Sequence, residues 1–279
     1  MNIQLKSRCS KSENLIRAEL ELKRSGKTSF ISHQLMPHPF HITVPFQFEE
    51  DPKDLVTIYM QSSSGGLYEK DLHDFTVRLQ KGSKLHLTTQ ASTIVHCAKE
   101  NLGSEAHVNL NLEDGTVLEY LPDPVILMAG SEFYSRSNIN LKGDCRAIVT
   151  ESFLAHDPSE TGQMFKSCNA ETLIFCADEL ILDDKFFITG HDYFSKIRGY
   201  TCMASIYLYG YGSSIVEKLK PALGQMSGSV TGFSHFKNRN LFVLKILAQG
   251  PISLLRTIES TWAMAREDMT GCVPRKRRK

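Results

Sequence analysis

Four carboxylates stand in or beside apolar, strand-like segments of this sequence: Asp71, Glu119, Asp123 and Glu151. A carboxylate buried among apolar side chains is costly unless a cation or several hydrogen bonds compensate its charge. The four residues are therefore candidates for pairing with a cationic side chain or for binding a metal ion. The alternative is that they occupy strand ends and turns and face water.

Motifs of the common enzyme classes do not occur in the sequence. Residues 24–28 (RSGKT) look like the end of a phosphate-binding loop, but Glu21 stands where that loop needs a glycine and no helix is expected to follow. No Gly-x-Ser-x-Gly or His-Glu-x-x-His motif is present. A hydrolase with a dispersed site, for example Ser131, His191 and Asp192, stays open as an alternative because the members of such a triad need not be close in sequence.

Histidine and cysteine spacing also fails to match a known metal centre. His38 and His41 flank Pro39, whose extended geometry need not bring the two imidazoles together. His86, in a β segment, is more typical of a structural residue. The seven cysteines are an odd number and form no Cys-x-x-Cys pair, so neither a disulfide framework nor a structural zinc site is expected.

The elements that must position these residues are mainly strands. Apolar and polar residues alternate in short segments, and this period of two is typical of strands with one buried face. The segments are 15–22, 40–48, 55–59, 75–79, 85–87, 107–113, 116–121, 147–153, 173–176 and 207–211. Turn signals fall at 64–66, 81–83, 113–115, 142–144 and 182–184. Strands without intervening helices predict a mainly β, antiparallel architecture.

Helical periodicity occurs only in the C-terminal half. Residues 213–223 form a short candidate helix interrupted by Pro221, and residues 241–244 indicate a buried strand. From Pro251 onward, apolar residues recur at three- and four-residue steps, which is typical of one helical face. They are Ile252, Leu255, Ile258, Trp262, Ala265 and Met269, and Gly271 follows as a stop signal. We predict a single domain over residues 1–274.

The charge is unevenly distributed, because residues 275–279 are all basic. Removing these five from the 32 basic residues leaves 27 against 31 acidic residues, so the body is mildly acidic and a poor match for nucleic acid. The tail alone could form a binding module for acidic partners, which is a further alternative. The charged start of the chain and the absence of a long apolar run predict a soluble, cytoplasmic protein with no membrane partner.

Short motifs occur in a characteristic order through most of the chain. They are residues 63–67 (SSGGL), Asp71, 87–93 (LTTQAST), 118–126 (LEYLPDPVI), 129–131 (AGS), Glu151, 240–250, Trp262, Arg266, Pro274 and Arg275. Together they resemble the urease accessory protein family called UreD, or UreH. The chain departs from the family pattern at Lys70, Ile94, Gln163 and Lys245, where glycine, lysine, glutamate and arginine are usual.

The resemblance implies a fold, a function and partners. The fold would be a large β-helical, or superhelical, stack of strands with two helices in the C-terminal half. The function would be that of a non-enzymatic scaffold that binds UreF, and through it the GTPase UreG, and docks on the urease apoprotein in a dimeric heterocomplex. No tightly bound cofactor is implied, only transient nickel passing through an internal conduit.

The resemblance also suggests which residues carry these roles. Nickel accepts carboxylate and other oxygen ligands, and passage requires weak, exchangeable sites. The candidates for metal passage are Asp71, Thr88, Thr89, Gln90, Glu119, Asp123 and Glu151. The candidates for partner docking are Trp262, Arg266, Pro274 and Arg275.

Overall fold

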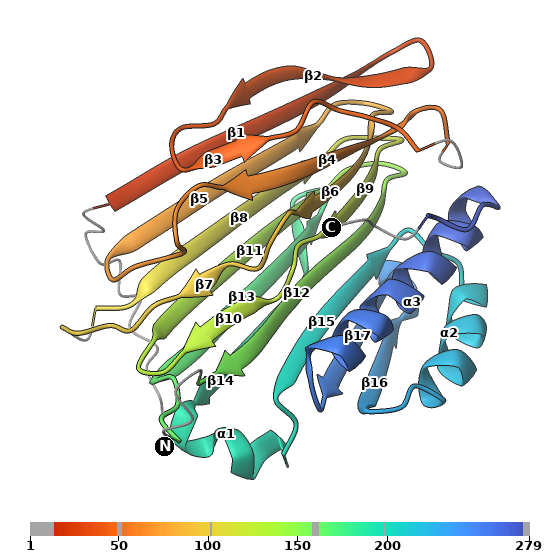
Figure 1. Cartoon of the computed structure of the whole chain (residues 1–279). Helices are drawn as coiled ribbons and strands as arrows, with labels where there is room; N and C mark the ends of the chain where they lie inside the picture. Colours follow the sequence, from red (N-terminus) through yellow and green to blue (C-terminus); the bar gives the residue numbers. More distant parts are fainter. Residues whose placement is uncertain (1–13, 49–51, 101, 158–161, 198, 276–279) are drawn as a thin grey trace.

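Strands of the protein form two sheets that face each other, with helices against the outer face of one of them (Figure 1). The computed structural model describes residues 14–48, 52–100, 102–157, 162–197 and 199–275. The seven-stranded sheet has the order β14 (Glu179–Thr189), β13 (Ser167–Cys176), β11 (Glu132–Leu141), β8 (Ser104–Leu112), β5 (Asp71–Leu79), β1 (Asn14–Ser25) and β2 (Thr28–Leu35).

The second sheet has ten strands in the described residues. Its main order is β16 (Ser229–Phe236), β17 (Leu241–Ala248), β15 (Cys202–Tyr209), β12 (Arg146–His156), β9 (Val117–Leu121), β6 (Lys84–Thr89), β4 (Leu55–Ser62) and β3 (Phe40–Ile42). In addition, β10 (Val125–Met128) pairs with β12, and β7 (Ile94–Val95) pairs with β10. The helices are α1 (Gly190–Ile197), α2 (Ser214–Gly224) and α3 (Pro251–Thr270), with a 3₁₀ turn at Lys237–Arg239.

The chain winds from one sheet to the other and back, as in a solenoid. β5, β8 and β11 lie in the seven-stranded sheet, and each is followed in the chain by a strand of the ten-stranded sheet: β6, β9 and β12. Strands from successive coils therefore pair side by side in parallel, as in β5 with β8 and β6 with β9. The predicted β-helical stack is confirmed, but the predicted antiparallel order is wrong for these coils. Antiparallel pairs occur towards the sheet ends, for example β13 with β14 and β15 with β17.

The turns explain why the strand direction was mistaken. The turns at 81–83, 113–115 and 142–144 are present, but each connects the two sheets instead of closing a hairpin. They stack on one another: the Gly82 N–H donates to the Asp114 carbonyl at 3.0 Å, and the Gly115 N–H donates to the Asp144 carbonyl at 3.1 Å. Gly143 completes this column of corners with φ of 61°. A glycine turn is needed in both a hairpin and a coil corner, so its sequence signal cannot separate them.

Two layers of apolar side chains hold the molecule together. Alternate residues of the strands, such as Val77, Leu87 and Leu118, fill the space between the sheets. The opposite face of the ten-stranded sheet packs against α2 and α3, where Ile258 and Trp262 contribute. Burying this apolar surface is the main favourable contribution to folding.

The predicted helices are largely confirmed. α2 contains Pro221, and α3 runs from Pro251 to a left-handed cap at Gly271, with φ of 73°. The face of α3 differs at its start: Leu254 is buried, whereas Ile252 is 67% exposed. The sequence did not predict α1, β7, β10, β11, β14 or β16, and residues 182–184 lie inside β14 instead of forming a turn.

In the part of the chain that the structure describes, no helix combines the length and apolar character needed to cross a bilayer. The single domain over residues 1–274 stays a prediction. Of the basic tail, only Arg275 belongs to the described residues, and it is exposed.

The column of corners can be tested with Gly143→Ala. A Cβ at this position would stand 2.3 Å from Asp114 Oδ1, and the alanine would have to adopt a positive φ. We expect a loss of about 1–3 kcal/mol in the free energy of unfolding, measured by urea denaturation. Gly224→Ala is the control: its added Cβ meets nothing within 4 Å, so the change should stay within about 0.5 kcal/mol. Equal stability of the two variants would contradict a strained corner.

Candidate functional site

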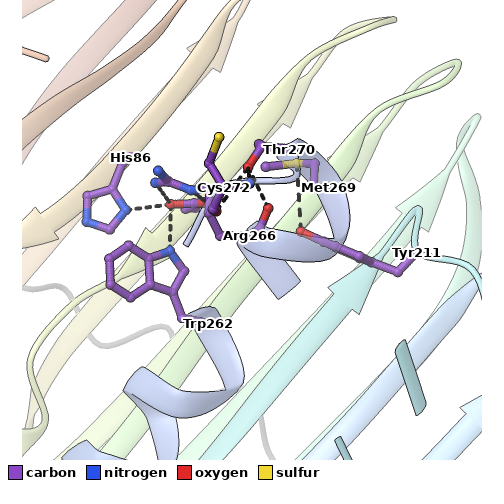
Figure 2. A network of polar contacts seen from close by, with 8 residues as sticks. His86, Tyr211, Trp262, Arg266, Met269, Thr270 and Cys272 are labelled. Carbon is purple, nitrogen blue, oxygen red and sulfur yellow. Dashed lines mark hydrogen bonds and ion pairs between the residues drawn. The ribbon is translucent and has the colours of Figure 1, made fainter. Parts of the chain in front are cut away.

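Glu119 lies at the centre of a buried polar network between the ten-stranded sheet and α3. Figure 2 shows three of its partners, His86, Trp262 and Arg266, pointing towards one another. Arg266 donates from Nε to Oε1 and from Nη2 to Oε2, both at 2.5 Å. Trp262 donates from Nε1 to Oε2 at 2.7 Å, and His86 Nδ1 lies 2.7 Å from the same oxygen. The carboxylate therefore has partners on both of its oxygens.

Strand and helix periodicity bring these residues together. On β9, Leu118 and Tyr120 point between the sheets, so Glu119 points towards α3. His86 is the register partner of Glu119 on the neighbouring strand β6. Trp262 and Arg266 are four residues apart on α3 and therefore share one face of the helix. The Arg266 guanidinium also lies 5.4 Å from the Trp262 ring.

The network determines the ionisation of Glu119. Burial disfavours the charged form, but the hydrogen bonds from Arg266 and His86 outweigh burial and lower the pKa of Glu119 from 4.5 to about 2. Glu119 is therefore ionised at neutral pH and held as an ion pair. Removing one partner of such a buried pair costs about 3–5 kcal/mol, because the other charge stays behind without compensation.

This geometry joins residues that the sequence assigned to different roles. Glu119 was a candidate for metal passage, and Trp262 and Arg266 were candidates for docking. Trp262 is 5% exposed and Arg266 is 1% exposed, so they offer a partner almost no surface in this conformation. Their observed contacts anchor α3 to the sheet, and the passage and docking roles stay predictions. The other docking candidates, Pro274 and Arg275, are half-buried and exposed.

The hydroxyl candidates connect β6 to the end of β9 and to the residues that follow it. Thr88 Oγ1 donates to the Leu121 carbonyl at 2.6 Å, and the Asp123 N–H donates to Thr89 Oγ1 at 2.8 Å. Gln90 is exposed and accepts a hydrogen bond from Gln61. Thr88, Thr89 and Asp123 therefore lie near one another, and their role in metal passage stays a prediction.

Asp71 lies apart from them, at the start of β5. Its Oδ2 accepts from the Tyr68 N–H at 2.8 Å, and its Oδ1 accepts from Asn14 Nδ2 at 3.1 Å. The first bond closes the turn that leads into β5, and the second links Asp71 to its register partner on β1. The observed contacts of Asp71 are thus those of a turn residue.

Glu151 lines a cavity of about 410 Å³ between the sheets. Its carboxylate accepts hydrogen bonds from Ser135 Oγ at 2.6 Å and Thr172 Oγ1 at 3.2 Å. Burial raises the pKa of Glu151, although the two hydroxyls act in the opposite direction. Asp184, on β14, lines the same cavity.

The surroundings of Asp184 complete the polar part of this cavity. Asp184 accepts hydrogen bonds from Lys245 Nζ and, at 2.6 Å, from the Tyr207 hydroxyl. Lys245 Nζ also donates to Ser205 Oγ at 2.8 Å. Asp184 was missed as a site residue because it was interpreted as part of a turn. Asp183 and Lys185 flank Asp184, so its local sequence is charged and gives no signal of a cavity.

The predicted carboxylates do not converge on one point. β9 and β12 are adjacent, with Ile148 beside Glu119. On β12, Ala147 and Val149 point between the sheets, and Glu151 has the same parity. Glu119 and Glu151 therefore lie on opposite faces of the ten-stranded sheet. A path that used both residues would have to cross the sheet.

The structure does not assemble the alternative hydrolase site. The Ser131 hydroxyl is fully buried and has no hydrogen-bond partner among the residues that the structure describes. Asp192 accepts a hydrogen bond from Lys196 at 2.9 Å instead of orienting a histidine. Among the described residues, no group of three or more histidine, cysteine, aspartate or glutamate side chains is placed to hold a metal ion.

The fold is thus a two-sheet β-solenoid whose last helix is fixed by a buried ion pair. Comparison with known proteins assigns the chain to a family: the sequence-family model described as "UreD urease accessory protein" matches residues 16–279. A UreD 1 protein of Methylorubrum extorquens is 30% identical over 271 residues, covering 95% of this chain and 92% of the relative. A UreD 1 protein of Methylorubrum populi is 31% identical over 274 residues, with the same coverage.

More distant relatives agree. A UreD 1 protein of Bradyrhizobium sp. strain BTAi1 is 28% identical over 275 residues and covers 97% of this chain and 98% of the relative. The chain belongs to the UreD family of urease accessory proteins. This membership supports a role in urease maturation and agrees with a non-enzymatic protein.

Substitution of Glu119 tests the buried pair. We expect Glu119→Gln to lower the free energy of unfolding by about 3–5 kcal/mol, because the Arg266 charge is left buried and unpaired. Adding Arg266→Met should restore part of this loss, which a double-mutant cycle in urea measures. Glu267→Gln is the matched control, since Glu267 is exposed on the same helix. Strictly additive losses would contradict a direct pair.

The pH dependence of stability tests the ionisation of Glu119. The folded-state pKa of Glu119 lies below its usual value. Its contribution to the free energy of unfolding is therefore complete above about pH 4.5 and is lost as the pH falls towards 2. We expect the stability of the unsubstituted protein to fall more steeply over this range than that of Glu119→Gln. Urea titrations at several pH values measure both slopes, and parallel curves would contradict the lowered pKa.

Proposed function

We propose that this protein is a non-catalytic scaffold of urease maturation. It binds UreF, recruits the GTPase UreG through UreF, and docks on the urease apoprotein so that nickel can be inserted. The observation that carries the proposal is the match of the UreD family model to residues 16–279. The relatives described above are all named urease accessory proteins.

The anchored last helix supports a scaffold role. A scaffold gains affinity when its binding surface is held in place before the partner arrives. The Glu119–Arg266 pair fixes α3, and the chain then leaves the helix towards Pro274 and Arg275. Arg275 is exposed, so this end of the molecule is available to a partner.

Nickel is the cargo of the proposed scaffold and not a resident cofactor. Transfer favours weak oxygen ligands that can exchange, and a carboxylate beside a cavity is suited to that role. Glu151 fits best among the seven candidates because it lines the inter-sheet cavity. Glu119 fits least well, because both of its oxygens are bound to neighbouring side chains.

Co-expression with a UreF homologue and the urease subunits tests the proposal. We expect a complex that co-elutes in size-exclusion chromatography. We also expect Glu151→Gln to lower urease activation by about tenfold, the scale on which changes around a metal alter its binding. Complex formation should stay unchanged. Glu179→Gln, on the exposed end of β14, is the matched control and should activate normally.

The scaffold role and the nickel passage can be contradicted separately. Persistent absence of a co-eluting complex would contradict the scaffold. A normal complex with unchanged urease activation by the Asp71→Asn/Glu151→Gln double variant would retain the scaffold and refute the nickel passage.

A further inference from the structure

The two sheets end unequally on one side of the molecule. In the described residues, β14 is the last strand of the seven-stranded sheet and pairs only with β13. The ten-stranded sheet continues from β12 through β15 and β17 to β16 (Figure 1). Asp184 of β14 reaches Tyr207 on β15 and Lys245 on β17, so β14 lies over these two strands. No described strand of the seven-stranded sheet follows β14 to cover β16.

The part of the ten-stranded sheet that the seven-stranded sheet leaves uncovered continues the apolar inner face of the ten-stranded sheet. The register aligns Phe153, Met203, Leu247 and Val230 in one row across β12, β15, β17 and β16. All four line the 410 Å³ cavity, together with Phe186 of β14. Val230 lies at the end of this row on the edge strand β16 and is 53% exposed, although it is apolar. We call this uncovered part of the sheet and the adjoining edge of β14 the β14 groove.

The β14 groove has a free backbone edge beside its apolar floor. An edge strand presents unpaired N–H and C=O groups, which can pair with an added strand. At one end, the Arg239 side chain donates to the Ile181 carbonyl and limits the groove there. From Asp184 to Thr189, β14 stays available for an added strand in the described part of the chain.

The charge of the cavity favours a cationic occupant. Two carboxylates, Glu151 and Asp184, face one ammonium group, that of Lys245. Lys185 also lines the cavity, but its ammonium group pairs with Glu171 and Asp183. With both carboxylates ionised, one negative charge is left over, so an added cation would favour the ionised form of Glu151, which burial disfavours.

We propose that the β14 groove binds an extended segment of a partner protein as an added strand, with a lysine or arginine side chain in the Glu151 cavity. The backbone of the segment pairs with β14, and its alternate side chains face the floor. Apolar residues two positions before and after the cation contact Phe186 and Val230. The aliphatic stem of the cation lies along the apolar walls while its charged tip reaches the carboxylates.

Synthetic heptapeptides test this proposal on the full chain, independently of urease activation. The probe is acetyl-TVTKTVT-amide, whose valines and lysine share one face of a strand. Isothermal titration calorimetry is performed with a chelator present, so that no metal ion competes for the carboxylates. We expect the peptide with norleucine in place of lysine to bind about tenfold more weakly, as expected for loss of a hydrogen bond to a charged group. A glutamate peptide should bind more weakly still.

Two controls separate the groove from unspecific binding. Methylation of alternate backbone nitrogens on the lysine peptide should abolish binding, because it blocks pairing with β14. Val230→Arg should weaken binding of the lysine peptide by at least about tenfold. The new charge repels the peptide lysine, and the larger side chain occupies part of the groove. Val44→Arg, at a site that is 83% exposed and next to β4, at the opposite end of the ten-stranded sheet from β16, should leave binding unchanged.

Specific results would overturn the proposal. Equal binding of the lysine, norleucine and glutamate peptides would refute the cationic occupant. Equal effects of Val230→Arg and Val44→Arg would refute the β14 groove. Concentration-dependent dimerisation that Val230→Arg abolishes, without peptide binding, would assign the groove to a second copy of this chain.

Discussion

The buried ion pair between Glu119 and Arg266 constrains the whole C-terminal half. Neither charge could lie in this apolar layer alone, because the loss of hydration would exceed any packing gain. The two residues are 147 positions apart, and their contact fixes α3 on the ten-stranded sheet. α3 in turn packs with α2 over β15 and β17, so the position of both helices depends on one carboxylate in β9.

The cavity arises where the solenoid stops. Through β12 and β13, each coil adds one strand to each sheet in parallel. The chain then turns back, adding one antiparallel strand, β14, to one sheet and three strands, β15, β17 and β16, to the other. The sheets therefore end at different places, and Glu151, Asp184 and Lys245 meet at the step. This end of the molecule combines an open strand edge, an apolar surface and two carboxylates against one ammonium group.

The sequence identified several residues of the two polar sites, but not how these residues are arranged in space. Glu119, Trp262 and Arg266 were all selected, yet for separate roles, because nothing local indicates that β9 and α3 meet. Glu151 was selected without its cavity partner Asp184, whose neighbours resemble a turn. Gly82, Gly115 and Gly143 were recognised as turn residues, but the pairing direction of the strands beside them was wrong.

The sequence by itself determined the features that depend on neighbouring residues: the period of two, the glycine corners, the start and end of α3, and the family motifs. These follow from backbone sterics and from which side chains alternate along a segment. Only the tertiary structure decided the direction of strand pairing, the partner of Glu119 and the unequal ends of the sheets. Such features depend on contacts between distant residues, and a local pattern has the same form whichever strand comes to lie beside it.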